Sequence, residues 1–212
     1  MFTSTIQLFD DYYRYADASQ SVGFNRDLAC EVREKLEQID YIVSKVRNLE
    51  QNILAVHSRL EEVLRTHIEN LKARGQSFEA NPIPAEAIIT REEEETILRA
   101  EFEMKLLTEA FYYFAGRVRS ILRHSSAPLP GLASFECEGV RNTRNKLLEH
   151  PEGKGSHVFI RSFAWGGAQG PVIKALRYDP QQHVFPDRGL YENAREFREN
   201  LERCIRTALG IA

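Results

Sequence analysis

Arg144 and His150 stand six residues apart in the segment RNKLLEH. Cleavage of a phosphodiester needs a group that transfers protons near neutral pH and a cation that stabilises the charged transition state, and histidine and arginine can supply these functions. Six residues on an ideal helix place two side chains about 120° apart around the axis, so they are not stacked. A long arginine side chain and a frayed helix end before Pro151 could still bring both to one groove.

The same segment also has a structural interpretation. Arg144 can pair with neighbouring carboxylates, and His150 can cap the helix that ends before Pro151, because a cation stabilises a helix C-terminus. The basic residues around the segment have two interpretations as well, a solvated helix face or a strip that binds RNA phosphates. These candidate RNA-binding residues are Arg117, Arg119, Arg123, Arg141 and Lys146.

The segment resembles the ribonuclease motif of the HEPN superfamily, a set of α-helical bundles. That motif is an arginine, often followed by a polar residue, and then a histidine after four to six residues; here five residues intervene and Asn145 takes the polar place. The resemblance implies a metal-independent endoribonuclease of a defence, stress or toxin–antitoxin type, in which two motifs meet across a homodimer. It implies that Arg144 holds the scissile phosphate, His150 transfers protons and Asn145 orients them.

The alternative belongs to a different class, a non-enzymatic helical protein that works by interaction or dimerisation. The long helices would then be the working surface, with either a second copy or a cognate protein as the partner. In that case the Arg144–His150 segment would be structural.

The spacing of apolar residues predicts a mainly α-helical protein of one domain, residues 1–212, with two long helices. Helices are expected within 1–22 and over 26–73, 91–124, 135–149 and 190–209. Thr90 and Glu93 form the sequence pattern of a capping box at the start of the second long helix. The acidic run 92–95 could instead ligate a metal, although acidic residues also favour the first turn of a helix.

The first long helix raises a problem of size. A continuous helix over 26–73 would extend about 70 Å, whereas a compact domain of this length has a radius of gyration of about 17 Å. We therefore expect the helix either to break near the polar stretch 48–52 or to project and pack on a second chain. The excess of apolar helix length predicts a homodimer.

Two segments rich in β-forming residues, 157–165 and 172–178, enclose a glycine-rich stretch. They predict a two-stranded β-hairpin at about 157–178, inserted before the last helix. Short hairpins are marginal in water alone, so Trp165 is expected to pack against the helices.

The composition excludes several classes of protein. The net charge of −3 argues against a surface coated in positive charge for DNA binding, but not against a local basic groove. Three cysteines at long spacings predict neither a zinc site nor a disulfide framework. Neither a secretory signal nor an apolar run of membrane length is present, so we expect a cytoplasmic protein without a membrane, metal or cofactor requirement.

Overall fold

The computed structural model describes residues 1–19, 21, 24–83, 89–124, 129–148, 157–163, 172–179 and 183–211. In chain order these contain the helices α1 (Thr3–Ala18), α2 (Arg26–Ala73), α4 (Arg91–His124) and α5 (Glu138–Leu148), the strands β1 (His157–Phe163), β2 (Val172–Asp179) and β3 (His183–Gly189), and the helix α6 (Leu190–Leu209). The described chain is mainly helical, as the spacing of its apolar residues predicts. Side chains are not described for Lys146 or for most of the sheet.

Helix α2 is a single unbroken helix of 48 residues. It begins where the side chain of Asn25 accepts a hydrogen bond from the backbone N–H of Leu28, at 3.0 Å. Of the two expected alternatives, the break near 48–52 is wrong, because the helix is continuous. Glu50, within that polar stretch, is only 7% exposed, and its carboxylate accepts a 2.5 Å hydrogen bond from the Tyr191 hydroxyl of α6. The polar stretch therefore joins α2 to α6.

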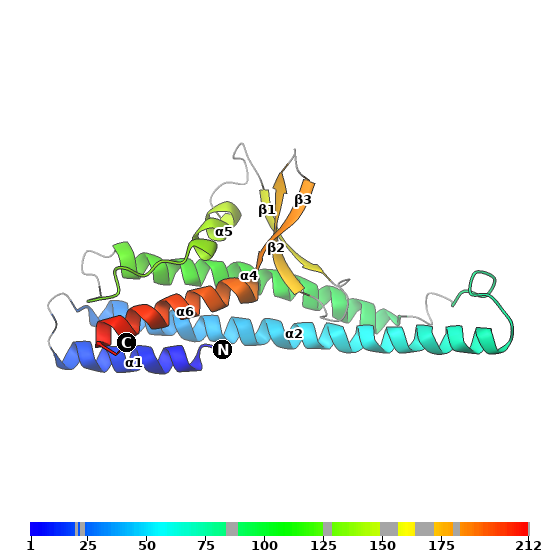
Figure 1. Ribbon diagram of the computed structural model, residues 1–212, viewed down its shortest axis with the longest axis horizontal. Helices are drawn as coiled ribbons and strands as arrows, with labels where there is room; N and C mark the ends of the chain where they lie inside the picture. The colour runs from blue at the N-terminus through cyan, green and yellow to red at the C-terminus, as the bar shows by residue number, and fades with distance from the viewer. Residues whose placement is uncertain are drawn as a thin grey trace.

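Helices α2 and α4 pack side by side in opposite directions (Figure 1). Three ion pairs of the two helices set the register: Glu31 with Arg117 at 2.7 Å, Lys45 with Glu103 at 3.5 Å, and Arg59 with Glu93 at 2.5 Å. Because α4 begins level with Arg59, the last turns of α2 have no α4 beside them. They project from the rest of the molecule, as Figure 1 shows.

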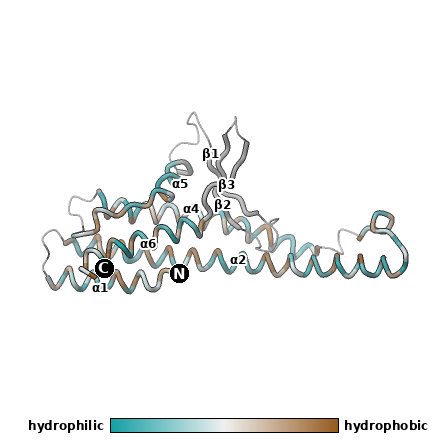
Figure 2. Tube along the Cα trace, viewed as in Figure 1, coloured by the Kyte–Doolittle hydropathy of each residue, from teal (hydrophilic) through white to brown (hydrophobic). Residues whose placement is uncertain are grey.

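The hydrophobic core lies where α1 and α6 pack beside the first half of α2 and the second half of α4 (Figure 1). Fully buried side chains from all four helices meet there, among them Phe9, Leu36, Phe111 and Phe197. Hydrophobic and hydrophilic residues alternate along the whole of α2, including the projecting part (Figure 2). In that part, however, Leu60, Val63, Leu64 and Ile68 are only half-buried.

The prediction of a two-stranded hairpin is wrong, because the structure has a three-stranded antiparallel sheet in the order β1-β2-β3. β1 pairs with β2 from His157↔Tyr178 to Phe163↔Val172, and β2 also pairs with β3, with an irregularity between Lys174 and Leu176. Pro186 argues against a strand at β3, since proline has no N–H for a ladder. At the edge of a sheet that N–H is not needed, so the proline is tolerated.

The third strand also changes how the sheet joins the helices. β3 ends at Gly189, and α6 begins at the next residue. The backbone N–H of Gly189 donates to the Glu192 side chain at 2.8 Å, which closes the first turn of α6.

Trp165 lies outside the described residues, so its packing stays a prediction. None of the described helices combines the length and the hydrophobicity that a membrane span requires.

Candidate functional site

Helix α5 carries the arginine of the RNKLLEH segment. The helix is shorter than expected at its N-terminal end, because residues 129–137 form turns before Glu138. Arg144 is half-buried against α4, where Gly116 leaves room for its side chain. A Cβ at position 116 would overlap the Arg144 Cδ and would lie 2.7 Å from its Nε. Asn145, the next residue, is exposed.

The N-terminus of α5 is held by α6. Asn193 is fully buried and its amide donates a 2.7 Å hydrogen bond to the Tyr112 hydroxyl of α4. Its Oδ1 lies against Gly139 so closely that a Cβ there would overlap it. The Glu196 carboxylate lies close to the same glycine, where negative charge stabilises the start of a helix. One side chain of α6 thus ties α4 and α5 together and sets where Arg144 lies.

Three of the predicted RNA-binding arginines meet at one carboxylate. Arg119 donates two hydrogen bonds to Glu136, of 2.8 and 3.2 Å. Arg123 forms an ion pair with the same carboxylate, and the Arg141 Nη1 lies 3.6 Å from it. We call these four side chains the arginine cluster. It brings the basic second half of α4 together with α5, with Glu136 between them.

Arg117 lies apart from this cluster. It forms two hydrogen bonds with Glu31 of α2, of 2.7 and 3.2 Å. The hydrogen bonds from Arg117 lower the pKa of the Glu31 carboxyl below its usual range, and they raise the pKa of the guanidinium. Its role in the described structure is to join α2 to α4. The sequence prediction placed Arg117 in the basic strip because it considered charge along one helix only.

The remaining predicted site residues are only partly described. His150 lies outside the described residues, and so does the side chain of Lys146. The position of His150 relative to Arg144, which the ribonuclease hypothesis needs, therefore stays a prediction. The structure places Arg144 one helical turn from Arg141 on α5, next to the arginine cluster.

Sequence reasoning missed the residues that organise this region. Glu136 stands in a turn-rich segment, and nothing in its spacing connects it to arginines 13 and 17 residues earlier. Gly116 did offer a signal, since an isolated glycine inside a helical pattern often marks a close packing contact. Asn193 gave none, because a single asparagine on an amphipathic helix is ordinary.

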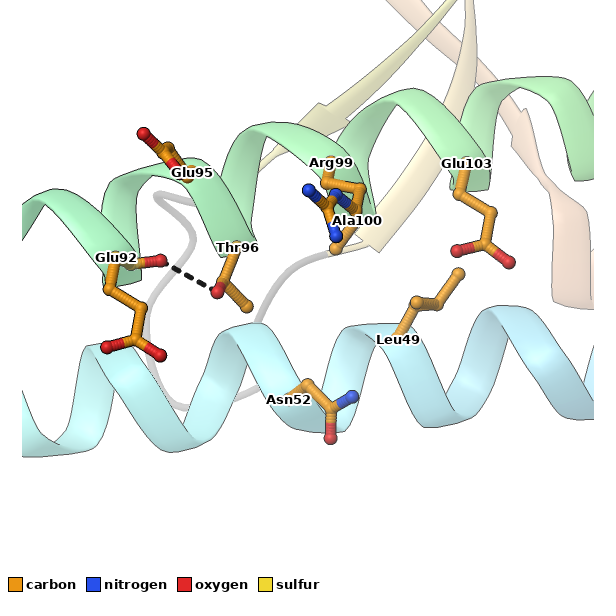
Figure 3. A pocket seen from close by; sticks show the side chains of 8 residues that line it. All are labelled: Leu49, Asn52, Glu92, Glu95, Thr96, Arg99, Ala100 and Glu103. Atoms are coloured by element: carbon orange, nitrogen blue, oxygen red, sulfur yellow. Dashed lines mark hydrogen bonds between the residues drawn. The ribbon is translucent and has the colours of Figure 1, made fainter.

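The acidic run 92–95 begins α4 beside a groove between α2 and α4 (Figure 3). The groove, of about 280 Å³, is lined by Leu49, Asn52, Glu92, Glu95, Thr96, Arg99, Ala100 and Glu103. The Glu93 carboxylate accepts a 2.9 Å hydrogen bond from the backbone N–H of Thr90. The Thr90 hydroxyl oxygen in turn accepts a 3.2 Å hydrogen bond from the backbone N–H of Glu93, so the capping box is confirmed. In the described part of the chain, no three His, Cys, Asp or Glu side chains gather to hold a metal ion.

A second candidate site is apolar. Leu98, Phe102, Leu106 and Tyr113 follow one another on α4 at steps of four, four and seven residues, which places them in one stripe. They are between 50% and 64% exposed. Tyr41 of α2, 64% exposed, lines a shallow groove with Leu107, Ala110 and Phe114 of α4. We call the four stripe residues and Tyr41 the α4 face.

Comparison with protein-family models, with curated proteins and with solved structures finds no match to this chain.

Proposed function

We propose that this protein is a helical interaction protein that pairs with a second copy of itself along the α4 face. The observation that carries the proposal is the exposure of four large hydrophobic side chains in one stripe of α4, together with Tyr41 at the groove between α2 and α4. Phe102, Tyr113 and Tyr41 alone expose on the order of 300 Å², an area in the range of the largest apolar patches of monomeric proteins, which often serve a function. A partner would remove this surface from water.

The charges beside the stripe favour a second copy over an unrelated partner. Lys105 and Glu109 are exposed, lie one turn apart on α4 and form no ion pair among the described residues. Two antiparallel copies of α4 related by a two-fold axis near Leu107 would bring Lys105 of each copy close to Glu109 of the other. A two-fold interface needs this kind of self-complementary patch.

Sedimentation tests the pairing. We expect wild-type protein at micromolar concentration to sediment at twice 24.4 kDa, and Phe102→Ser to shift it to the monomer. Tyr15→Ser is the matched control, because Tyr15 is 53% exposed on α1, outside the α4 face. Lys105→Glu should weaken pairing, and the double variant Lys105→Glu, Glu109→Lys should restore it. A wild type that stays monomeric refutes the proposal.

A second candidate function is metal-independent RNA cleavage, as the HEPN resemblance implies. It is favoured by the positive charges where α4 meets α5: Arg119, Arg123 and Arg141 pair with Glu136 and Glu138, and Arg144 lies one turn from Arg141. In this proposal Arg144 stabilises the phosphate, Asn145 orients the reacting groups, and His150 transfers protons. Without a metal-activated water, the RNA 2′-hydroxyl attacks the adjacent phosphorus and the bond to the 5′-oxygen breaks. One product then ends in a 2′,3′-cyclic phosphate or its opened form, and the other begins with a 5′-hydroxyl.

Incubation with total RNA in EDTA tests this candidate. We expect His150→Ala and Arg144→Ala each to lower the cleavage rate by about 10²–10⁴-fold, and Arg141→Ala to lower it much less. If Arg141 is essential and Arg144 dispensable, the motif has been placed wrongly. If the wild type cuts no RNA, the enzyme hypothesis fails and the interaction protein remains.

A further inference from the structure

The arginine cluster contains more hydrogen-bond donors than its carboxylate can use. Three guanidinium groups carry five N–H donors each, whereas the Glu136 carboxylate has two oxygens. Glu138 adds a second carboxylate, 3.6 Å from the Arg141 Nη2 and itself 70% exposed. Three positive charges thus meet two negative ones, in a protein whose net charge is −3.

The backbone at Glu136 is anchored, but its side chain is not enclosed. Phe135 and Cys137 on either side are fully buried, and the Glu136 carbonyl accepts a 3.0 Å hydrogen bond from the Asn200 amide of α6. The Glu136 side chain remains 35% exposed. Rotation about its own bonds could therefore carry the carboxylate out of the cluster while the backbone stays in place.

The cations lie at the surface where α4 meets α5, and not in an enclosed pocket. Arg119 and Arg123 are one turn apart on α4, and Arg141 and Arg144 are one turn apart on α5. The three arginines of the cluster are between 14% and 38% exposed. Partly exposed guanidinium groups that converge on one carboxylate can hold one backbone phosphate of a single strand that lies across the surface.

We propose that the Glu136 carboxylate occupies the position of a backbone phosphate, and that single-stranded RNA displaces it to bind Arg119, Arg123 and Arg141. Glu136 then acts as an internal competitor that keeps the RNA site closed in the free protein. The inference rests on the RNA-directed candidate function for its ligand class. It requires no cleavage and no dimer.

Fluorescence anisotropy of a labelled single-stranded RNA oligonucleotide tests this, with every variant made in His150→Ala so that cleavage cannot alter the signal. Glu136→Gln should tighten binding about tenfold, the order of one charge-assisted hydrogen bond. The slope of log Kd against log salt should steepen by about one, as for an added phosphate contact. Glu31→Gln is the control, because it makes the same charge change and releases Arg117.

The outcomes separate the alternatives. If Glu136→Gln and Glu31→Gln tighten binding equally, only net charge acts and the inference is overturned. It is also overturned if Glu136→Gln leaves the affinity unchanged or lowers it. If inorganic phosphate competes as well as unlabelled oligonucleotide at equal phosphate concentration, the ligand is free phosphate and the RNA assignment fails.

A second pair of variants decides the question if Glu136→Gln does not fold. Arg123→Gln should weaken RNA binding severalfold, whereas Arg117→Gln, on the same helix but paired with α2, should change it less than twofold. Equal effects would overturn the inference. Tight binding by a protein that never cleaves RNA would refute the ribonuclease candidate and leave this site standing.

Discussion

Gly116 of α4 lies beneath the side chain of Arg144 of α5, with no space for a Cβ between them. The glycine is therefore a packing residue within a helix of 34 residues. It lets α5 approach α4 closely, beside the place where Arg119 and Arg123 of α4 meet the Glu136 carboxylate. The position of the candidate site therefore depends on having a glycine, which has no side chain, at position 116.

Gly116→Ala should destabilise the protein by less than about 1 kcal/mol, because the new methyl group must displace the flexible side chain of Arg144 from its contact with α4. The sign is informative, since alanine in an ordinary helix interior would stabilise by about 0.5–1 kcal/mol relative to glycine. Urea denaturation measures the difference, with Ser120→Ala on the same helix as the control. A Gly116→Ala protein more stable than the wild type would show that Arg144 does not pack as described.

Gly139→Ala should cost about 1–3 kcal/mol, because its Cβ would overlap the Asn193 Oδ1 and crowd the Glu196 carboxylate. Asn193 cannot retreat without giving up its 2.7 Å hydrogen bond to Tyr112. Thermal unfolding followed by circular dichroism would record a lower Tm. The control is Asn142→Ala, at an exposed position of α5, and an equal Tm for both variants would contradict the close contact.

Tyr191→Phe should destabilise the protein by about 1–3 kcal/mol, because it removes a hydrogen-bond donor from a buried carboxylate. The hydroxyl lies 2.5 Å from the Glu50 Oε2. Burial is the main cause that raises the pKa of Tyr191, and the hydrogen bond to Glu50 raises it further. Chemical denaturation should show a much smaller loss for Tyr15→Phe, which removes an exposed hydroxyl. Equal losses would mean that the contact between α2 and α6 contributes little.

The Glu31–Arg117 pair predicts a dependence of stability on pH. Arg117 lowers the pKa of the folded Glu31 below its ordinary value of 4.5. The pair therefore stabilises the fold above pH 4.5, and this contribution is lost as the pH falls through the lowered pKa. Glu31→Gln should cost a few tenths to about 1 kcal/mol at pH 7, because the pair is partly exposed.

Denaturation at a series of pH values checks this, and the gap between wild type and Glu31→Gln should close below pH 4.5. The control is Glu34→Gln, which removes an exposed carboxylate of the same helix. A gap that persists unchanged at low pH would mean that the loss comes from packing and not from charge.

The helices could be predicted from the sequence because their signals are local. Apolar spacing and the absence of proline and glycine predicted α2 with the bounds that the structure has, and the pairing of Thr90 with Glu93 marked the start of α4. Such signals lie within one or two turns of the chain. They need no knowledge of what the helix packs against.

Only the tertiary structure decided what surrounds the basic residues and how the sheet is built. Arg117 meets a carboxylate 86 residues away, and Arg119 meets one 17 residues away, so neighbours along α4 have unrelated partners. The third strand escaped prediction because Pro186 is acceptable only at a sheet edge, and which strand lies at the edge depends on the pairing. The polar stretch 48–52 suggested a break in the helix, but Glu50 within it is a buried contact because Tyr191 comes to it from α6.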